Sequence, residues 1–274
     1  MKKLLVLALF LLTGCSTQQP TFSNLVDTTS QTIVAQAMQD AGISEAATKD
    51  FLTAVTNYNV TVENTSLIKE GFVEQVPQYD ELALADKWEE KNGLYIGNNC
   101  RITSFGLIND LIDVTTATAN DANLFMDKDA INYAPTAWLD EDTNRFTTLF
   151  GFVPTPNTKD ITVHVANLQQ AWQERGIHFK ANTQAKLISV VMHSTLDNQL
   201  FIGHVGVLVP HKDGYLFIEK LSFQEPYQAV QFADKEQLNT YLMTKYDVSF
   251  NQPEAKPFIM ENDQLLATYQ ALDK

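Results

Sequence analysis

Three apolar segments between residues 187 and 223 limit the fold of this chain most tightly. LISVVMHS (187–194), FIGHVGVLVP (201–210) and GYLFIEKLSF (214–223) are rich in β-branched and aromatic residues, which favours strands. The HKDG sequence between the second and third segments is typical of a hairpin turn. We therefore expect an antiparallel sheet here, which AVQF (229–232) extends by a fourth strand.

The segments before this sheet have helical periodicity. Apolar residues recur at helical spacing, and capping residues bound the runs, in segments 32–41, 44–55, 81–91, 100–112, 121–131 and 165–175, with one more helix expected after the sheet at 235–243. TTLFGFVPTPNTKD (147–160) is expected to form a loop. A helical first half followed by an antiparallel sheet is an α+β fold. We expect one domain over residues 31–274, in which residues 31–75 are either part of the main body or a helical lobe.

The first fifteen residues, MKKLLVLALFLLTGC, have the pattern of an export signal. A basic start, a short apolar run and small residues before a cleavage point are typical of a signal peptide, and the run is shorter than a membrane span. The tetrad ending at Cys15 resembles the lipobox of bacterial lipoproteins, which implies cleavage after residue 14 and a lipid on the Cys15 thiol; the alternative is an ordinary signal peptide. Polar residues 15–30 then read as a tether to the membrane.

The charge and the residue types exclude several classes of function. The formal net charge is −14, so nucleic acid is a poor partner. The histidines have no zinc-like spacing and the 11 glycines form no phosphate-binding loop, so we expect no metal or cofactor. The chain has two cysteines; once Cys15 carries lipid, Cys100 has no disulfide partner.

Cys100 lies where a thiol becomes reactive. It follows the turn-forming sequence GNN and precedes an apolar helix. Unpaired N–H groups and the helix dipole at such an N-terminus stabilise a thiolate. A thiolate nucleophile also needs a base, normally a histidine oriented by a third polar group.

His204 is the candidate base, and Glu219 is the candidate orienting group. His204 lies in an apolar strand between Gly203 and Gly206, which leave room for close approach. If Pro210 lies opposite Tyr215 across the hairpin, Glu219 is the diagonal neighbour of His204 on the same face. The sequence thus predicts a cysteine at a helix start, a histidine on a strand and a carboxylate on the next strand.

This order resembles that of papain-like cysteine peptidases, and GHVGVLV resembles the histidine strand of their NlpC-type cell-wall hydrolases. The resemblance implies a papain-like architecture with Cys100 as nucleophile, His204 as base and Glu219 as orienter. The backbone N–H of Cys100, with Asn98 or Asn99, would form the oxyanion hole. Leu94 departs from the pattern, because papain has a glutamine at that place, and Asn99-Cys100-Arg101 departs from the aspartate–cysteine context of the cell-wall enzymes.

At larger scale, IGNNCRITSF, FIGHVGVLVP, IEKLSFQEPYQAVQF and KPFIMENDQLL resemble a family of bacterial lipoproteins catalogued as domain of unknown function 4300, over residues 60–270. That resemblance supplies no activity.

Each candidate has a plainer structural interpretation. Cys100 is otherwise a small buried apolar residue, His204 a core histidine, and Glu219 the solvated side of an edge hairpin. His193 is a rival base, whereas the remaining histidines, His164, His178 and His211, are expected on the surface or in turns. Three residues are candidates for lining a substrate cleft: Arg101, for which a structural salt bridge is the alternative, Gln224 and Tyr227.

The functional hypothesis is a lipid-anchored thiol hydrolase of the bacterial cell envelope that cleaves an amide or peptide bond, with cell-wall peptide as the first substrate to test. Acyl or amide transfer is open to the same triad. The rival hypothesis is a non-catalytic surface lipoprotein that binds a ligand or a protein partner on a hydrolase-like scaffold.

Overall fold

The computed structural model describes residues 19–115, 119–248 and 252–272. Its α-helices are α1 (Thr28–Asp40), α2 (Glu45–Thr61), α3 (Glu81–Asn92), α4 (Cys100–Ile108), α5 (Phe125–Asn132), α6 (Asp140–Phe150), α7 (Ile161–Glu174) and α8 (Lys235–Tyr246). Its strands are β1 (Thr21–Ser23), β2 (Ile112–Val114), β3 (Val153–Pro154), β4 (Ile177–Phe179), β5 (Lys186–Ser194), β6 (Gln199–His211), β7 (Gly214–Lys220), β8 (Tyr227–Phe232), β9 (Phe258–Glu261) and β10 (Gln264–Leu265). Short 3₁₀ turns, Asn109–Leu111 and Ala122–Leu124, follow α4 and precede α5.

An eight-stranded sheet organises the molecule, and its main strands run in the order β1-β8-β7-β6-β5-β9-β10, with β3 beside β6. The pairings are antiparallel, which confirms the α+β class. Pro210 lies opposite Tyr215, the register expected from the hairpin turn. β7 is an interior strand between β6 and β8, so the edge-hairpin interpretation of Glu219 is wrong.

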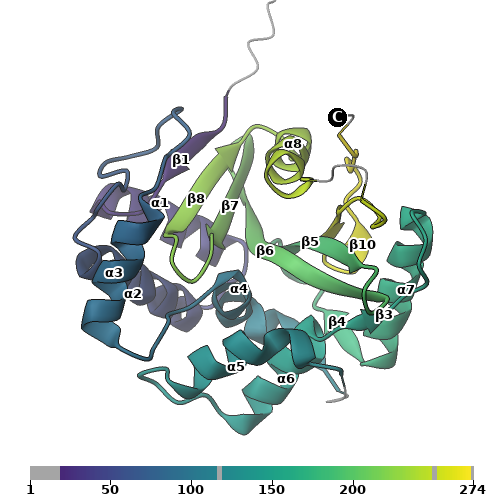
Figure 1. The fold of residues 1–274 in the computed structure, drawn as a ribbon. Helices are drawn as coiled ribbons and strands as arrows, with labels where there is room; N and C mark the ends of the chain where they lie inside the picture. Colours follow the sequence, from purple (N-terminus) through teal and green to yellow (C-terminus); the bar gives the residue numbers. More distant parts are fainter. Residues whose placement is uncertain (1–18, 116–118, 249–251, 273–274) are drawn as a thin grey trace, which may run out of the picture.

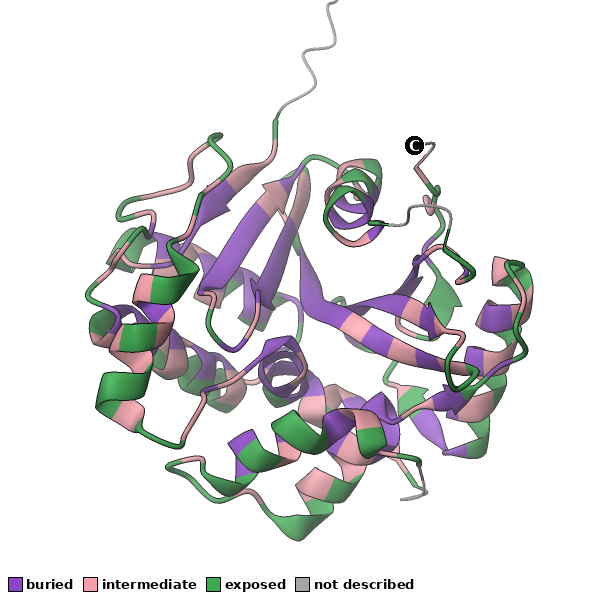
Figure 2. Cartoon of the chain, in the orientation of Figure 1, coloured by how far each residue is buried: buried purple, intermediate pink, exposed green. Residues whose placement is uncertain are grey.

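Apolar side chains pack on both faces of the sheet. One face is covered by α1, α2 and α4, with Val34, Phe51 and Phe105 in one large core. The other face is covered by α8, whose Leu238 and Leu242 belong to a second core. Figure 1 shows α8 and α4 on opposite sides of the central strands, and Figure 2 shows that α4 and β6–β8 are buried along most of their length. Among the described residues, the helices are all too short or too polar to cross a membrane.

Three expectations about local structure are wrong. The helix expected over residues 100–112 ends at Ile108, and Ile112 begins the strand β2. Residues 147–150 belong to the last turn of α6 and not to a loop: Phe146, Leu149 and Phe150 are buried on one face, but the acidic first turn obscures that apolar spacing in the sequence. The tether cannot extend to residue 30, because Thr21–Ser23 pairs with β8 and α1 begins at Thr28. Residues 31–75 pack their apolar side chains into the same large core as the rest of the chain. Cys15 lies outside the described residues.

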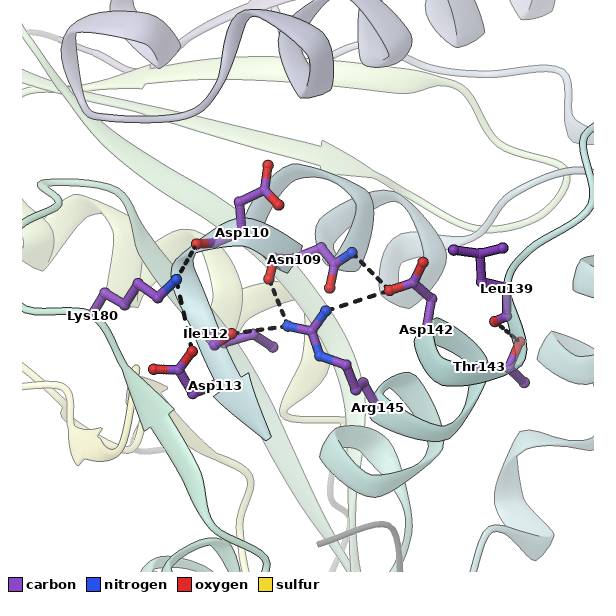
Figure 3. A network of polar contacts seen from close by, with 9 residues as sticks. All are labelled: Asn109, Asp110, Ile112, Asp113, Leu139, Asp142, Thr143, Arg145 and Lys180. Atoms are coloured by element: carbon purple, nitrogen blue, oxygen red, sulfur yellow. Dashed lines mark hydrogen bonds and ion pairs between the residues drawn. The ribbon is translucent and has the colours of Figure 1, made fainter. Parts of the chain in front are cut away.

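A polar network anchors the end of α4 distant from Cys100. Arg145 of α6 donates to the carbonyl oxygens of Asn109 (2.7 Å) and Ile112 (2.9 Å), and its Nη1 lies 3.4 Å from Asp142 Oδ1 (Figure 3). Lys180 donates to the Asp110 carbonyl at 2.9 Å. These contacts satisfy carbonyl groups at a helix end and hold α4 in place against α6 and β2.

Candidate active site

The first turn of α4 lies against the N-terminal half of β6. The pairing of β6 with β7 runs from the turn to Val207 and Ile218. Beyond that point groups from α4 contact the β6 backbone: Arg101 Nη1 donates to the Ile202 carbonyl (3.0 Å) and Ser104 Oγ to the Val205 carbonyl (3.3 Å). The start of α4 therefore occupies the place where β6 and β7 diverge.

The helix begins at Cys100 because Asn99 caps it. The side chain of Asn99 accepts a hydrogen bond from the Ile102 N–H at 3.0 Å, which satisfies one of the unpaired donors of the first turn. Ile102, Phe105 and Ile108 then bury their side chains in the core. The capping geometry places the thiol of Cys100 at the positive end of the helix dipole.

His204 and Glu219 form a buried pair on the α8 face of the sheet. His204 Nε2 lies 2.6 Å from Glu219 Oε2, and the side chains are 1% and 0% exposed, respectively. Alternation along β7 places Glu219 on the same face as Phe217, which packs against α8. The contact uses one ring nitrogen of His204 and leaves Nδ1 for another partner.

Cys100, a residue that is 5% exposed, lies near enough to His204 for each group to shift the pKa of the other. Burial raises the pKa of the thiol, but its hydrogen bond with His204, the charges of His204 and Arg101, and the Val205 N–H together lower the pKa below its ordinary value. Burial lowers the pKa of His204, but its hydrogen bonds with Cys100 and Glu219 outweigh burial and raise the pKa to about 9. At neutral pH these shifts favour a thiolate–imidazolium pair.

The carboxylate of Glu219 is held by two further donors. Gln228 Nε2 and Tyr241 Oη donate to Glu219 Oε1 at 2.9 and 2.7 Å. Burial raises the pKa of Glu219, but its contacts with His204 and Tyr241 hold the pKa below its usual range. Glu219 is therefore charged and fixed in orientation, as an orienting group for an imidazole must be.

Arg101 and Asn99 meet at a buried carboxylate that the sequence did not single out. Asp127 of α5 is fully buried and accepts from Asn99 Nδ2 (2.7 Å), Arg101 Nε (2.9 Å) and Arg101 Nη2 (2.7 Å). With Nη1 on the Ile202 carbonyl, Arg101 forms the structural ion pair that was the alternative to a cleft position. The amide of Asn99 is also held in place: its oxygen accepts from the Ile102 N–H and its nitrogen donates to Asp127.

Asn98 and Tyr227 lie beside the start of α4 and contact each other. Asn98 Nδ2 donates to Tyr227 Oη at 3.2 Å, and Asn98 Oδ1 accepts from Tyr95 Oη at 2.9 Å. Tyr227 is buried, with its ring edge-on to Tyr58, so it is part of the wall behind the site. Gln224 is exposed, and its carbonyl accepts from the Tyr58 hydroxyl.

Lys220 is an unexpected buried cation beside this wall. Its ammonium donates to the carbonyl oxygens of Ser222 (2.7 Å), Phe223 (3.2 Å) and Glu225 and lies 4.3 Å from the centroid of the Tyr58 ring. Burial lowers its pKa to about 7. These contacts hold the turn between β7 and β8 that follows Glu219.

The remaining histidines have other roles. His193 Nδ1 accepts from the Ala255 N–H (3.1 Å), and its ring centroid lies 4.5 Å from that of His164. The base that contacts Glu219 is therefore His204 and not His193. His164 is fully buried between Thr155 and Thr158, so its expected surface position is wrong. His178 is exposed and His211 half-buried.

Two further residues of the site could not be inferred from the sequence. Tyr246, the last residue of α8, stacks on the His204 ring with a centroid distance of 4.7 Å and an interplanar angle of 18°. Tyr241 belongs to the same helix and precedes Tyr246 by slightly more than one turn. Both are part of an ordinary polar helix in the sequence, and only packing on the sheet brings them to His204 and Glu219.

Within residues 19–115, 119–248 and 252–272, no group of three or more histidine, cysteine or acidic residues could hold a metal ion. The arrangement can instead support nucleophilic chemistry by a thiolate, with an imidazole to transfer protons and a carboxylate to orient it.

Comparison with known proteins gives a family and no activity. No curated protein matches the chain, and no solved structure matches it. A family model described as a domain of unknown function, DUF4300, matches residues 21–266, a span that contains the sheet, the helices on both of its faces and the cluster around Cys100. The chain belongs to this DUF4300 family.

Proposed function

We propose that this protein is a papain-like thiol hydrolase that cleaves an amide or peptide bond, with Cys100 as nucleophile, His204 as base and Glu219 as orienter. The observation that carries the proposal is the buried cluster in which the Cys100 thiol and His204 shift each other's pKa and His204 Nε2 lies 2.6 Å from Glu219 Oε2. The three groups come from three different elements and are buried together. A thiolate–imidazolium pair of this kind is the resting form of an activated cysteine nucleophile.

The reaction follows from these positions. The Cys100 sulfur adds to the substrate carbonyl carbon, and the electron pair of the C=O bond moves to oxygen. When the C=O bond re-forms, the C–N bond breaks, and the leaving amine takes the proton from His204. Water then attacks the thioester, His204 receives a proton from it, and the carboxylic acid leaves as the Cys100 sulfur is released.

Attack by an amine acceptor instead of water would give acyl transfer through the same thioester. The triad of Cys100, His204 and Glu219 serves either acceptor equally. Hydrolysis and transfer are separated by adding amino-group acceptors to the reaction and identifying the products by mass spectrometry.

The location and substrate class are part of the proposal. The LTGC sequence before residue 16 supports export and lipid attachment at Cys15, which would hold the domain at a bacterial membrane beside the cell wall. Cell-wall peptide is therefore the first substrate to test. Detergent partitioning of the full-length protein against Cys15→Ala tests the anchor: equal partitioning of both would contradict it.

The first experiment measures the reactivity of the thiol. The full-length protein is treated with iodoacetamide at pH 7, and the peptide containing Cys100 is quantified by mass spectrometry. We expect rapid labelling of the wild type and of the exposed-histidine control His178→Ala, and slow labelling of His204→Ala. Equal labelling of all three proteins would show that His204 does not activate the thiol.

One observation favours the rival, a non-catalytic binding protein on a hydrolase-like scaffold. The thiol and the imidazole are 5% and 1% exposed, so a substrate reaches them only if neighbouring side chains move. A cavity of about 430 Å³ lies elsewhere, between α1 and α2, beside Gln39, Thr48 and Leu52. Identical products from cell-wall fragments treated with wild type and with Cys100→Ala would remove that substrate, and a thiol inert at pH 7 would favour the rival.

A further inference from the structure

The hydroxyl of Tyr246 is a polar group in the site to which the triad assigns no task. The Tyr246 ring lies parallel to the His204 ring, 4.7 Å away. The hydroxyl oxygen is buried and has no hydrogen-bond partner among the described residues. A buried hydroxyl without a partner costs free energy, so its presence on a tyrosine stacked against the imidazole of the site calls for an explanation.

Three polar side chains of the site and of the start of α4 differ from Tyr246 in this respect. Tyr241, from the same helix, has its hydroxyl on Glu219. Asn99 is bonded to Asp127 and Ile102, and Asn98 to Tyr227 and Tyr95. Each of these amides is thus held by hydrogen bonds on its oxygen and its nitrogen, whereas the Tyr246 hydroxyl has no hydrogen-bond partner among the described residues.

Electrostatics keep this hydroxyl in its donor form. Burial raises the pKa of Tyr246, and the negative charges of Glu219, Cys100 and Glu225 raise it further. The group is therefore protonated throughout the working pH range and cannot act as a base. The position of the hydroxyl in the site follows from the stacking of its ring on His204.

We propose that the Tyr246 hydroxyl donates a hydrogen bond to the oxyanion that forms when the Cys100 sulfur adds to a substrate carbonyl. The inference rests on the proposed thiol hydrolase. In the addition step the C–S bond forms and the carbonyl π electrons move to oxygen, where the Tyr246 O–H and the backbone N–H of Cys100 stabilise the negative charge. No proton leaves Tyr246, and the hydrogen bond weakens again when the C=O bond re-forms.

Two reactions of the same thiol separate this role from thiolate formation. Acylation of Cys100 by p-nitrophenyl acetate passes through a tetrahedral oxyanion, whereas alkylation by iodoacetamide displaces iodide and has no oxyanion. Both are measured on the full-length protein, the first as the burst of p-nitrophenolate and the second by mass spectrometry of the Cys100 peptide. Cys100→Ala defines the background of the burst.

In Tyr246→Phe the stacked ring remains and only the hydroxyl is lost. We expect the acylation rate to fall at least about 10-fold, because removal of one oxyanion donor is costly, while the alkylation rate stays within about twofold. Tyr215→Phe, a tyrosine outside the site, serves as the matched control and should change neither rate. Because the hydroxyl has no partner to lose, Tyr246→Phe should melt at the wild-type temperature or above.

An unchanged acylation rate in Tyr246→Phe would overturn the inference, as would an equal fall in both rates, since that would place the hydroxyl in thiolate formation. Failure of the proposed hydrolase looks different: the wild-type thiol itself would then fail to alkylate at pH 7.

Discussion

Replacing Glu219 with glutamine removes a charge from the site at nearly constant size. Glu219 accepts one hydrogen bond on Oε2, from His204, and two on Oε1, from Gln228 and Tyr241. An amide has a single acceptor oxygen, and it will face the two donors. Its NH₂ group then faces His204 Nε2, which must accept, so the ring proton moves to Nδ1 and the imidazole can no longer take a proton from the thiol.

The size of the effect follows from the pKa of His204. Burial lowers that pKa, yet the contacts with Cys100 and Glu219 raise it to about 9 from the ordinary 6.5, a difference equivalent to about 3 kcal/mol. If Glu219 supplies about half, its neutralisation destabilises the thiolate–imidazolium pair by about 1–2 kcal/mol. The equilibrium constant for forming the thiolate–imidazolium pair should then fall about 5- to 30-fold.

The assay is the second-order rate of iodoacetamide labelling at Cys100 between pH 5 and 9. Glu225→Gln is the matched control: it makes the same chemical change at a half-buried neighbour whose side chain does not contact His204, and it should label like the wild type. Circular dichroism and thermal melting confirm that both variants are folded. Labelling of Glu219→Gln at the wild-type rate throughout this range would refute the claim that Glu219 controls the imidazole.

Three more predictions concern the groups around the triad. The wild-type alkylation rate should change less than about fivefold between pH 7 and 9, because the lowered thiol pKa and the His204 pKa of about 9 keep the pair charged. The alkylation rate of an ordinary thiol changes about 20-fold over this range, and a change of that size would disprove the ion pair. Asp127→Ala leaves Arg101 buried without its carboxylate and should lower the free energy of unfolding in urea by about 3–5 kcal/mol; a loss below 1 kcal/mol would show that the pair is dispensable. Lys220→Met leaves the carbonyl oxygens of the β7–β8 turn without their donor and should cost about 1–3 kcal/mol in the same measurement, while unchanged stability would mean that these carbonyls find other donors.

The relation between His204 and Glu219 could be predicted from the sequence because it depends on local rules. A two-residue turn sets the register of a hairpin, and the register decides which residues share a face. A loop at residues 211–214 predicts Pro210 opposite Tyr215, and the structure has that pairing with His211 also opposite Gly214. A turn at Asp213-Gly214 would have shifted the register but left Glu219 on the same face as His204. The start of α4 is similarly local, because Asn99 supplies the cap within three residues of the donor it satisfies.

The surroundings of the triad depend on contacts between distant segments, and the sequence contains no comparable rule for them. Asp127 lies 26 residues from Arg101 and meets it only because α5 packs beside the start of α4. The sequence left two interpretations of Arg101 open, a cleft residue or a partner in an ion pair. The structure shows the ion pair with Asp127 and a hydrogen bond to the Ile202 carbonyl. Tyr241 and Tyr246 belong to a helix that follows the sheet and reach Glu219 and His204 by folding back across its face.

The sequence by itself determined the class of fold, the alternation along β6 and β7 and the capped helix that begins at Cys100, because strand period, turn chemistry and helix capping act over a few residues. The tertiary structure alone decided that the thiol, the imidazole and the carboxylate meet, that they are buried, and that one tyrosine hydroxyl beside them has no described partner. Those properties depend on how α4, α8 and the sheet pack together. Packing brings together residues that are far apart in the chain. It therefore sets the pKa values of Cys100 and His204 and leaves the Tyr246 hydroxyl without a described partner, and the proposed chemistry depends on both.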